Sequence, residues 1–309
     1  MIFILIIFLD ELFYRMPFFC RHDSETTYSP EELLGMILSH AKTIAEEYTG
    51  QKPIRDVVLT VPVYFNQAER RALTKAADLA GLNLLQLISE PMAIALNYGM
   101  FRRKEINGTA KYLMFYDMGA YDTTVSIVGY SVVKSKDRGF TETHPQAQIL
   151  GVSYDRTLGG LDLRVKIREY LADKFNELKK PKTDVRKNNR AMGKLFKEAE
   201  KVKIVLSANK NCFAQIENVM DDIDFKLEVT RDTLLELNAD FFKRVIGPVE
   251  KAIQSWGGTL EEISEVILAG AGTRVPKVQE ILSEFIGADR ELGKNLNTGK
   301  VHRKKIVAT

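Results

Sequence analysis

The stretch that decides the fold is Val57–Pro91, which reads VVLTVPVYFNQAERRALTKAADLAGLNLLQLISEP. It begins with a continuous apolar run over Val57–Val61, which is typical of a strand covered on both faces. Residues 66–81 then predict a helix, because asparagine is a favourable N-cap and glycine commonly follows the last helical turn. A second apolar run over Leu84–Ile88 predicts another strand, and a short helix is predicted over 90–99. Alternating strands and helices at this spacing indicate an α/β fold with a mostly parallel, covered sheet.

The elements on either side extend this pattern. Upstream, Ser29-Pro30-Glu31-Glu32 predicts the capped start of a helix whose apolar positions keep the helical period to Tyr48. Downstream, three strands with short polar connections are expected to pair antiparallel, over 112–117, 123–130 and 146–152. The remaining elements are long helices over 161–178, 189–207 and 230–256, short strands over 212–217 and 225–229, and a closing strand and helix over 265–268 and 275–286.

The composition excludes several classes of protein. The chain has 309 residues, of which 45% are hydrophobic and 28% charged, so it is neither disordered nor of low complexity. Its 44 Lys and Arg against 41 Asp and Glu give a net charge of +3, which is too small for a polyanion-binding surface, and no nucleic-acid partner is expected. Cys20 and Cys212 lie far apart and the four histidines show no ligand spacing, so no thiolate or imidazole metal site is expected.

The chain begins with an apolar run, Met1–Leu9. As a helix this run would rise about 14 Å, against about 30 Å for the hydrocarbon core of a membrane, so no membrane span is expected. The run lacks the preceding basic residue and the small residues of a cleavage site that a secretory signal needs. We therefore expect a buried strand, or a run that reflects only how the start of the chain was defined. Asn107-Gly108-Thr109 is a glycosylation sequon and a hint of compartment.

Three turns carry residues suited to phosphate or metal chemistry. The first, Asp117–Thr124, places a carboxylate at a strand end before a hairpin, which can hold a hydrated metal ion and point N–H groups at phosphate, although its spacing alone fits an ordinary hairpin better. The second, Ala269–Arg274, is a glycine-rich connection from strand to helix that lets a ligand approach the backbone. The third, Leu158–Asp162, would alone be a simple helix start. Together the three turns indicate a nucleotide.

In four segments the sequence resembles the nucleotide-binding domain of the 70-kDa heat-shock chaperones. These segments are Thr60–Asn66 (TVPVYFN), Leu158-Gly159-Gly160, Leu237–Asp240 (LNAD) and Gly272–Pro276 (GTRVP). The resemblance covers residues 29–298 in the family's order. Further stretches look closer to the large endoplasmic-reticulum members of the family, namely 65–71, 101–104, 114–119, 155–160 and 205–209. The resemblance implies the actin-like ATPase (ribonuclease H-like) fold, with nucleotide between two lobes, and a lumenal location that would give the sequon at Asn107 a meaning.

The resemblance also implies roles for particular residues. Asp117 matches an acidic residue that holds magnesium through water, and Glu90 matches a glutamate near the metal and the attacking water, so both are catalytic candidates. Glu200, Lys203 and Ser207 match the helix face that contacts adenosine, and their spacing places them on one stripe, although a solvated Glu–Lys pair would fit this spacing as well. The implied nucleotide-binding residues are Gly119, Ala120, Tyr121, Asp122, Gly159, Gly160, Glu200, Lys203, Ile204, Ser207, Gly270, Ala271, Gly272, Thr273 and Arg274. The implied cofactors are ATP or ADP with Mg²⁺.

The sequence departs from the family's pattern at the phosphate hairpin, where the family reads Asp-Leu-Gly-Gly-Gly-Thr-Phe-Asp. Ala120 and Tyr121 replace the second and third glycines, and Thr124 replaces the final aspartate. A tyrosine is unfavourable if position 121 needs a positive φ, and loss of the carboxylate at 124 removes a candidate for orienting or deprotonating water. Ile204 replaces an arginine that lies against adenine, and Ala271 replaces a further glycine. Hydrolysis is therefore expected to be slow or absent.

The resemblance divides the chain into parts. The family's first phosphate hairpin and a lysine that follows it have no counterpart in Met1–Tyr28. We expect a non-matching apolar leader over 1–28, a remnant of the first lobe over 29–115, the second lobe over 116–298 with an outer subdomain at about 159–238, and a basic tail over 299–309. With phosphate held from one side only, nucleotide binding is expected to be weak.

These observations favour an ATP- or ADP-binding module of an endoplasmic-reticulum chaperone that acts in protein folding and the stress response. Its expected partners are an adenine nucleotide, a smaller heat-shock chaperone and unfolded clients of the intact protein. The alternative is an interaction module that promotes nucleotide exchange on a smaller chaperone without turnover of its own. A kinase of the same superfold is less favoured, because no acceptor-site aspartate stands in a sugar-binding context.

Overall fold

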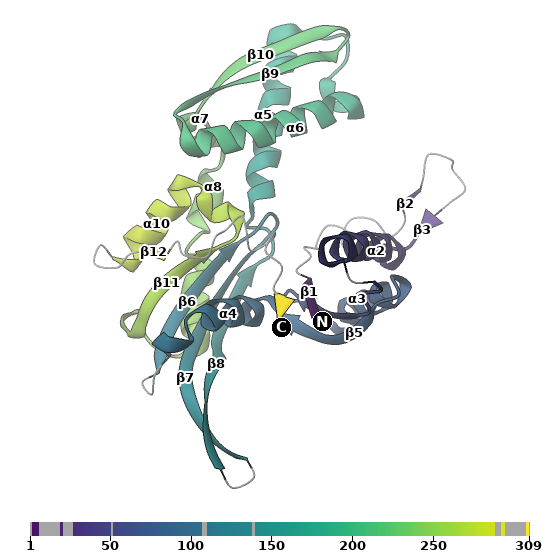
Figure 1. The fold of residues 1–309 in the computed structure, drawn as a ribbon. Coiled ribbons are helices and arrows are strands. Elements are labelled where there is room, and N and C mark those ends of the chain that lie inside the picture. Colours follow the sequence, from purple (N-terminus) through teal and green to yellow (C-terminus); the bar gives the residue numbers. More distant parts are fainter. Residues whose placement is uncertain are drawn as a thin grey trace. The chain divides into compact units, whose positions relative to one another are not determined.

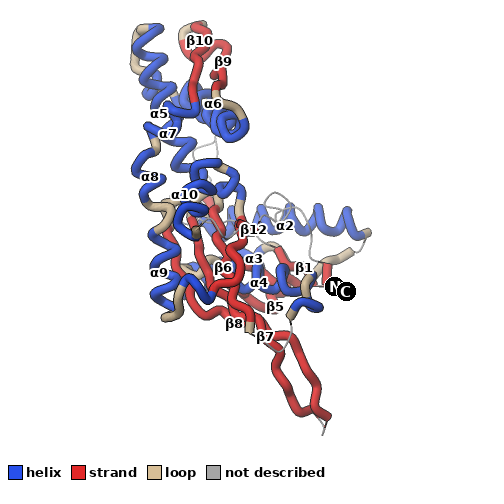
Figure 2. Tube along the Cα trace, turned by 90° about the vertical axis from the view of Figure 1, so that its left-hand side faces the viewer, coloured by secondary structure: helices blue, strands red, loops and turns tan. Residues whose placement is uncertain are grey.

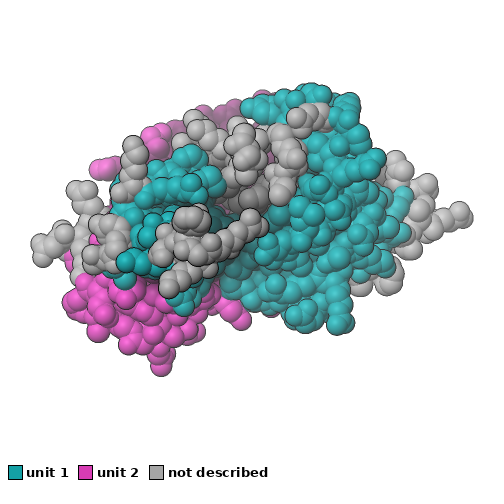
Figure 3. Space-filling model, turned by 60° about the horizontal axis from the view of Figure 1, so that its bottom comes forward, with its two compact units in different colours: residues 1–110, 130–149, 299–309 teal, residues 111–129, 150–298 magenta. Residues whose placement is uncertain are grey.

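The computed structural model describes residues 2–5, 19–20, 27–50, 52–106, 110–137, 140–287, 292–293 and 307–308. The chain divides into two compact units, which Figure 3 colours separately. Unit 1 contains residues 1–110, 130–149 and 299–309, and unit 2 contains residues 111–129 and 150–298. Within the described ranges, no helix is both long and apolar enough to cross a membrane.

Unit 1 contains a small sheet with the strand order β13-β1-β4-β5. Its described elements are α2 (Pro30–Thr49), β4 (Asp56–Val61), α3 (Gln67–Leu79), β5 (Asn83–Ser89), α4 (Glu90–Phe101), η1 (Arg103–Glu105) and the short strands β1 (Ile2–Leu5), β2 (Phe19–Cys20), β3 (Thr27–Tyr28) and β13 (Val307–Ala308). Both β5 and β1 pair parallel with β4. The alternation predicted for Val57–Pro91 is therefore confirmed, and residues 2–5 of the apolar start form a strand.

The long helices of unit 1 begin where the sequence predicts. The hydroxyl of Ser29 accepts a hydrogen bond from the N–H of Glu32, whose carboxylate accepts one from the N–H of Ser29, and Asn66 with Glu69 forms the same capping box at α3. These two helices bury their apolar faces against β4. The core formed in this way contains Leu34, Leu38, Val57, Leu59, Val61, Leu73, Ala76 and Ala77.

Unit 2 is built on a mixed five-stranded sheet with the order β12-β11-β6-β7-β8. Its strands are β6 (Lys111–Met118), β7 (Thr123–Asp137), β8 (Phe140–Asp155), β11 (Ile263–Ala269) and β12 (Leu292–Gly293), of which the parts of β7 and β8 within 130–149 belong to unit 1. β11 pairs parallel with β6 and with β12. β7 and β8 run side by side as the long ribbon in Figure 1. β8 begins at Phe140, earlier than the strand predicted over 146–152.

The helices of unit 2 fall into two groups. One packs on the sheet and consists of α8 (Ala239–Lys243), α9 (Gly247–Trp256) and α10 (Pro276–Ile286). The other forms a second core and consists of α5 (Gly160–Lys179), α6 (Asn189–Ala208) and α7 (Arg231–Leu237), with the hairpin of β9 (Asn211–Met220) and β10 (Ile223–Thr230). Figure 2 shows this second group at one end of unit 2. The 3₁₀ turns are η2 (Val185–Lys187), η3 (Leu260–Glu262) and η4 (Ala271–Arg274).

The single helix predicted over 230–256 is wrong, because the structure has α7, α8 and α9 there. α7 is followed by Asn238, whose backbone leaves the helical region (φ −114°, ψ 20°) and whose side-chain amide donates a 2.8 Å hydrogen bond to the carbonyl oxygen of Leu234. Pro248 stands in the first turn of α9, where a missing N–H costs nothing. A polar break and a proline thus divide a segment whose apolar period is continuous.

Candidate functional site

Two neighbouring strands of unit 2 bring the first and second predicted turns together. Asp117 near the end of β6 lies opposite Ala269 at the end of β11, and Gly270 follows directly. A Cβ atom at Gly270 would overlap the carbonyl oxygen of Met118 and Oδ1 of Asp117, and its φ of 75° is unfavourable for other residues. A Cβ at Gly272 would lie 3.0 Å from the carbonyl oxygen of Gly119. These glycines therefore allow the 270–274 turn to pack directly on the hairpin.

Asp117 is the carboxylate near the end of β6, and within the described residues no group of three or more histidine, cysteine, aspartate or glutamate side chains is placed to hold a metal ion. It is partly buried at the strand end, and burial raises its pKa to about 6. Burial makes the ionised form of a carboxylate costly, and a nearby cation offsets that cost. Hard oxygen donors suit magnesium, which keeps most of its water ligands in protein sites. The donor at this strand end therefore fits hydrated magnesium, which Asp117 would hold through water.

The phosphate-hairpin turn is closed by a hydrogen bond from the N–H of Gly119 to the carbonyl oxygen of Asp122 (2.9 Å). The residues with positive φ in the described ranges, other than glycine, are Lys180, Asn218, Asp221 and Asp222. Tyr121 is not among them, so its backbone has no positive φ. The positive φ that would make a tyrosine unfavourable at position 121 is therefore not present. The turn is thus compatible with the two residues that replace glycine.

The third predicted turn lies against the hairpin. A Cβ atom at Gly159 would lie 2.5 Å from the carbonyl oxygen of Ala120, so this position requires glycine. The N–H of Gly160 donates to the carbonyl oxygen of Gly119 (3.0 Å), and the N–H of Leu161 donates to that of Ala120 (2.6 Å). The first turn of α5 is thereby fixed to the hairpin.

The predicted face of α6 also reaches this cluster. Nζ of Lys203 lies 2.9 Å from Oε2 of Glu200 and 3.2 Å from the carbonyl oxygen of Gly160. The hydroxyl of Ser207 donates to the carbonyl oxygen of Lys203 (2.9 Å). Ile204 is 60% exposed. The structure therefore brings together, within unit 2, residues from all three turns and from α6.

A cavity of about 90 Å³ borders this face of α6. It is lined by Leu163, Lys203, Leu206, Ser207, Arg231, Leu234, Leu235, Val275, Pro276, Lys277 and Glu280. Two of these are predicted site residues, whereas Arg231, Lys277 and Glu280 were not predicted. Nε of Arg231 donates to the carbonyl oxygen of Leu206 (2.8 Å), and Lys277 pairs with Glu280 (2.6 Å). No local motif marks these three residues, because only the packing of α7 and α10 near α6 places them here.

Two predicted residues lie outside this cluster. Glu90 belongs to unit 1, where it is the first residue of α4 and is 7% exposed. Asn107, the predicted glycosylation site, lies outside the described residues.

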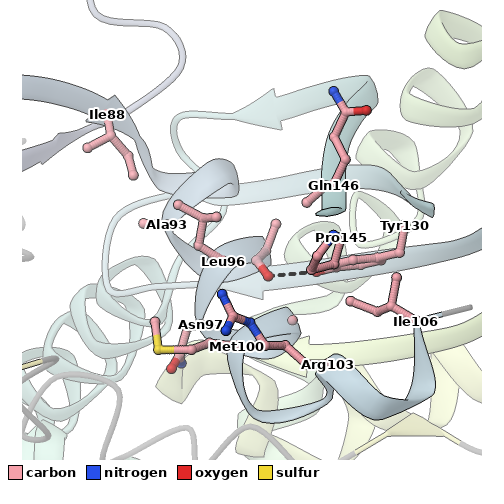
Figure 4. Close-up of a pocket in the computed structure, with 13 residues that line it drawn as sticks. Ile88, Ala93, Leu96, Asn97, Met100, Arg103, Ile106, Tyr130, Pro145 and Gln146 are labelled. Atoms are coloured by element: carbon pink, nitrogen blue, oxygen red, sulfur yellow. Dashed lines mark hydrogen bonds between the residues drawn. The ribbon is translucent and has the colours of Figure 1, made fainter. Parts of the chain in front are cut away.

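Unit 1 contains a cavity of about 200 Å³ beside α4, at which no predicted site residue lies. Figure 4 shows its lining, which is mostly apolar. The hydroxyl of Tyr130 donates a hydrogen bond to the carbonyl oxygen of Ala95 (2.7 Å), which ties β7 to α4. Arg103, Asn97 and Gln146 contribute the larger polar side chains of the lining.

Comparison with known proteins places this arrangement in a family. A family model described as Hsp70 protein matches residues 18–302. Hypoxia up-regulated protein 1 of Xenopus laevis is 56% identical over 273 residues, which are 88% of this chain and 42% of that protein. The proteins of that name from Danio rerio and Homo sapiens are each 54% identical, over 90% and 89% of this chain and 28% and 27% of their own length. The chain thus spans less than half the length of these curated relatives.

The family model covers most of the chain and includes residues of both units. The resemblance drawn from the sequence motifs is therefore confirmed, and so is the α/β fold class that they imply. The chain belongs to the Hsp70 family and has the actin-like ATPase fold of that family's nucleotide-binding domain.

Proposed function

We propose that this chain is an adenine-nucleotide-binding domain of an endoplasmic-reticulum chaperone related to hypoxia up-regulated protein 1. The observation that carries the proposal is the convergence, within unit 2, of the hairpin at 119–122, the glycines at 159–160 and the turn at 270–274 on the Asp117 strand end. The glycines at 159, 270 and 272 let these turns approach one another where a side chain would collide, and turn backbones gathered in this way are suited to binding phosphate.

In this proposal each part of the cluster has a role. Gly119 to Asp122 and Gly159-Gly160 form the phosphate side, and Asp117 holds hydrated Mg²⁺, which would neutralise charge on the phosphates. Lys203 and Glu200 are held by their mutual ion pair on one face of α6, where they and Ser207 contact the nucleoside. Gly270, Ala271, Gly272, Thr273 and Arg274 border the nucleoside from the other side. Ile204 offers an apolar contact without a cation–π contribution.

Hydrolysis is proposed to be weak or absent. The reason is chemical, since threonine at position 124 is a poorer general base than a carboxylate. The lumenal location, the partner chaperone, unfolded clients and glycosylation at Asn107 are proposed from the relatives named hypoxia up-regulated protein 1 and from the sequon.

Titration of the purified chain with ATP and ADP in MgCl₂ by calorimetry, combined with thermal melting, tests the proposal. Saturable binding that raises the melting temperature is expected, and Glu200→Ala should weaken it, because Glu200 holds Lys203. Lys197→Ala, an exposed position on the same helix, is the matched control and should bind as the wild type does. A cooperative melt without binding at millimolar nucleotide would contradict the proposal and point to the interaction module.

A further inference from the structure

The cavity of about 200 Å³ beside α4 lies within unit 1, because every residue that lines it belongs to 1–110 or 130–149. Its inner wall includes Ala93, Ala95 and Tyr130, all buried, whereas Leu96 and Met100 on the outer side are 46% and 44% exposed. An apolar cavity of about 150 Å³ is large enough to hold a benzene ring. This cavity therefore has room for a small apolar group that enters from solvent.

The inner wall of the cavity is held in place. The hydroxyl of Tyr130 donates to the carbonyl oxygen of Ala95, and the ring of Tyr130 lies 6.0 Å from that of Tyr98, between centroids. A Cβ atom at Gly99 would lie 2.9 Å from Cε1 of Tyr130, so α4 and β7 approach each other closely here. A cavity that is already formed costs its ligand little ordering of the protein.

One charged side chain of the lining has no counterion. Arg102 and Arg103 are consecutive, but only Arg102 pairs with Glu105 (3.9 Å), and it also lies over the ring of Tyr98. Arg103 lines the cavity, and among the described residues its guanidinium has no hydrogen-bond or ion-pair partner. Figure 4 shows this guanidinium turned toward Met100. An unpaired guanidinium beside an apolar cavity is suited to a carboxylate.

The rest of the lining agrees with a negatively charged head group. As far as the structure describes it, the lining contains no carboxylate, so nothing there repels an anion. Asn97 and Gln146 add amide donors, and within the described ranges neither side chain is engaged by another residue. A cation would be repelled by Arg103, and a wholly apolar ligand would leave these polar groups without a partner.

We propose that this cavity binds a medium-chain fatty acid. The acyl chain lies between α4 and the start of β8, and the carboxylate pairs with Arg103 at the opening. The inference concerns unit 1 alone and requires neither nucleotide nor turnover, so a failure of ADP binding leaves it standing.

Titration of the purified chain with octanoate by calorimetry tests the proposal. Saturable binding is expected, and hexanoate should bind about fifteenfold more weakly, because each buried methylene is worth about fourfold in affinity. Arg103→Gln should weaken octanoate binding about tenfold, the worth of a charge-assisted hydrogen bond. Arg71→Gln is the matched control, since Arg71 is an exposed arginine on α3 that does not line the cavity. Uncharged 1-octanol should bind the wild type and Arg103→Gln equally.

A second pair of measurements places the ligand. Ala93→Leu fills the inner end of the cavity and should abolish binding. The ¹³C-methyl resonance of Met100, assigned with Met100→Leu, should shift when octanoate is added to the wild type. If Ala93→Leu does not melt cooperatively, this resonance decides, because a shift supports the proposal and an unchanged resonance during binding refutes it.

Three results would overturn the proposal. The first is a cooperative melt without octanoate binding at millimolar concentration. The second is equal octanoate affinity in Arg103→Gln and the wild type. The third is a dimer in sedimentation that dissociates in Leu96→Glu and is unaffected by octanoate, which would assign the opening of the cavity to a second copy of the chain.

Discussion

Nζ of Lys203 on α6 donates a hydrogen bond to the carbonyl oxygen of Gly160 at the first residue of α5, across 3.2 Å. This bond joins the helix face assigned to the nucleoside with the turn assigned to phosphate. The same ammonium group pairs with Glu200 one turn earlier on α6. A single cation therefore connects two parts of the site that are more than forty residues apart in sequence.

Lys203→Met should weaken ADP binding about tenfold, because it keeps the apolar stem and removes the charged group. The loss is measured by calorimetry in MgCl₂. Lys197→Met, at an exposed position on the same helix, is the control and should bind ADP as the wild type does. Equal affinity in the Lys203 variant and the control would show that this ammonium group does not contact the nucleotide.

Gly270→Ala should destabilise the chain by at least about 2 kcal/mol, because a Cβ atom would meet the Met118 carbonyl oxygen and a positive φ disfavours alanine. Gly193→Ala on α6 is the opposite case, because a Cβ added at this helical position would have nothing within 4 Å. That variant should be more stable than the wild type by about 0.5–1 kcal/mol. Urea denaturation of the two variants measures both values. A neutral Gly270→Ala would mean that the two turns do not approach as closely as described.

The sequence predicts the architecture well where local signals agree with one another. Ser29 with Glu32, and Asn66 with Glu69, mark helix starts through side-chain caps that the structure contains. The prediction of a single helix over 230–256 is wrong because the apolar period continues through the break at Asn238. That break depends on a side-chain hydrogen bond and not on hydrophobicity.

Prediction of the site has a different limit. The glycine turns and the stripe on α6 were found because they are local in sequence, and the structure brings those of unit 2 together. Arg231, Lys277 and Glu280 beside that stripe were not found, since only the tertiary packing of α7 and α10 places them there.

Asp117→Asn should stabilise the nucleotide-free chain at pH 8 by about 2 kcal/mol. Burial raises the pKa of Asp117 to about 6, above the value of about 3.9 in the unfolded chain. The folded wild type therefore loses stability relative to the variant as pH rises from about 4 to 6, and the difference stays constant above that range. Thermal melting in EDTA between pH 4 and 8 measures this difference.

The same variant should lose the magnesium dependence of ADP binding, because the carboxylate that favours the cation is absent. A gain in stability with a loss of magnesium response is the combination expected of a functional residue. A variant that is less stable than the wild type at every pH would instead assign Asp117 a structural role.

Asp155→Asn should destabilise unit 2 at neutral pH by about 1 kcal/mol, because it removes a paired carboxylate that is only partly exposed. Nη2 of Arg244 lies 2.6 Å from both carboxylate oxygens of Asp155 and so ties the end of β8 to the end of α8.

Burial alone would raise the pKa of Asp155, but the hydrogen bonds from Arg244 and Thr157 outweigh it and hold the pKa below its usual value. The stabilisation is thus fully present above about pH 4, the unfolded pKa, and is lost as pH falls through the folded value. Urea denaturation at pH 7, 5 and 3.5 should show a gap between wild type and variant that is constant at the first two values and smaller at the third, whereas a gap that widens on acidification would refute the assignment.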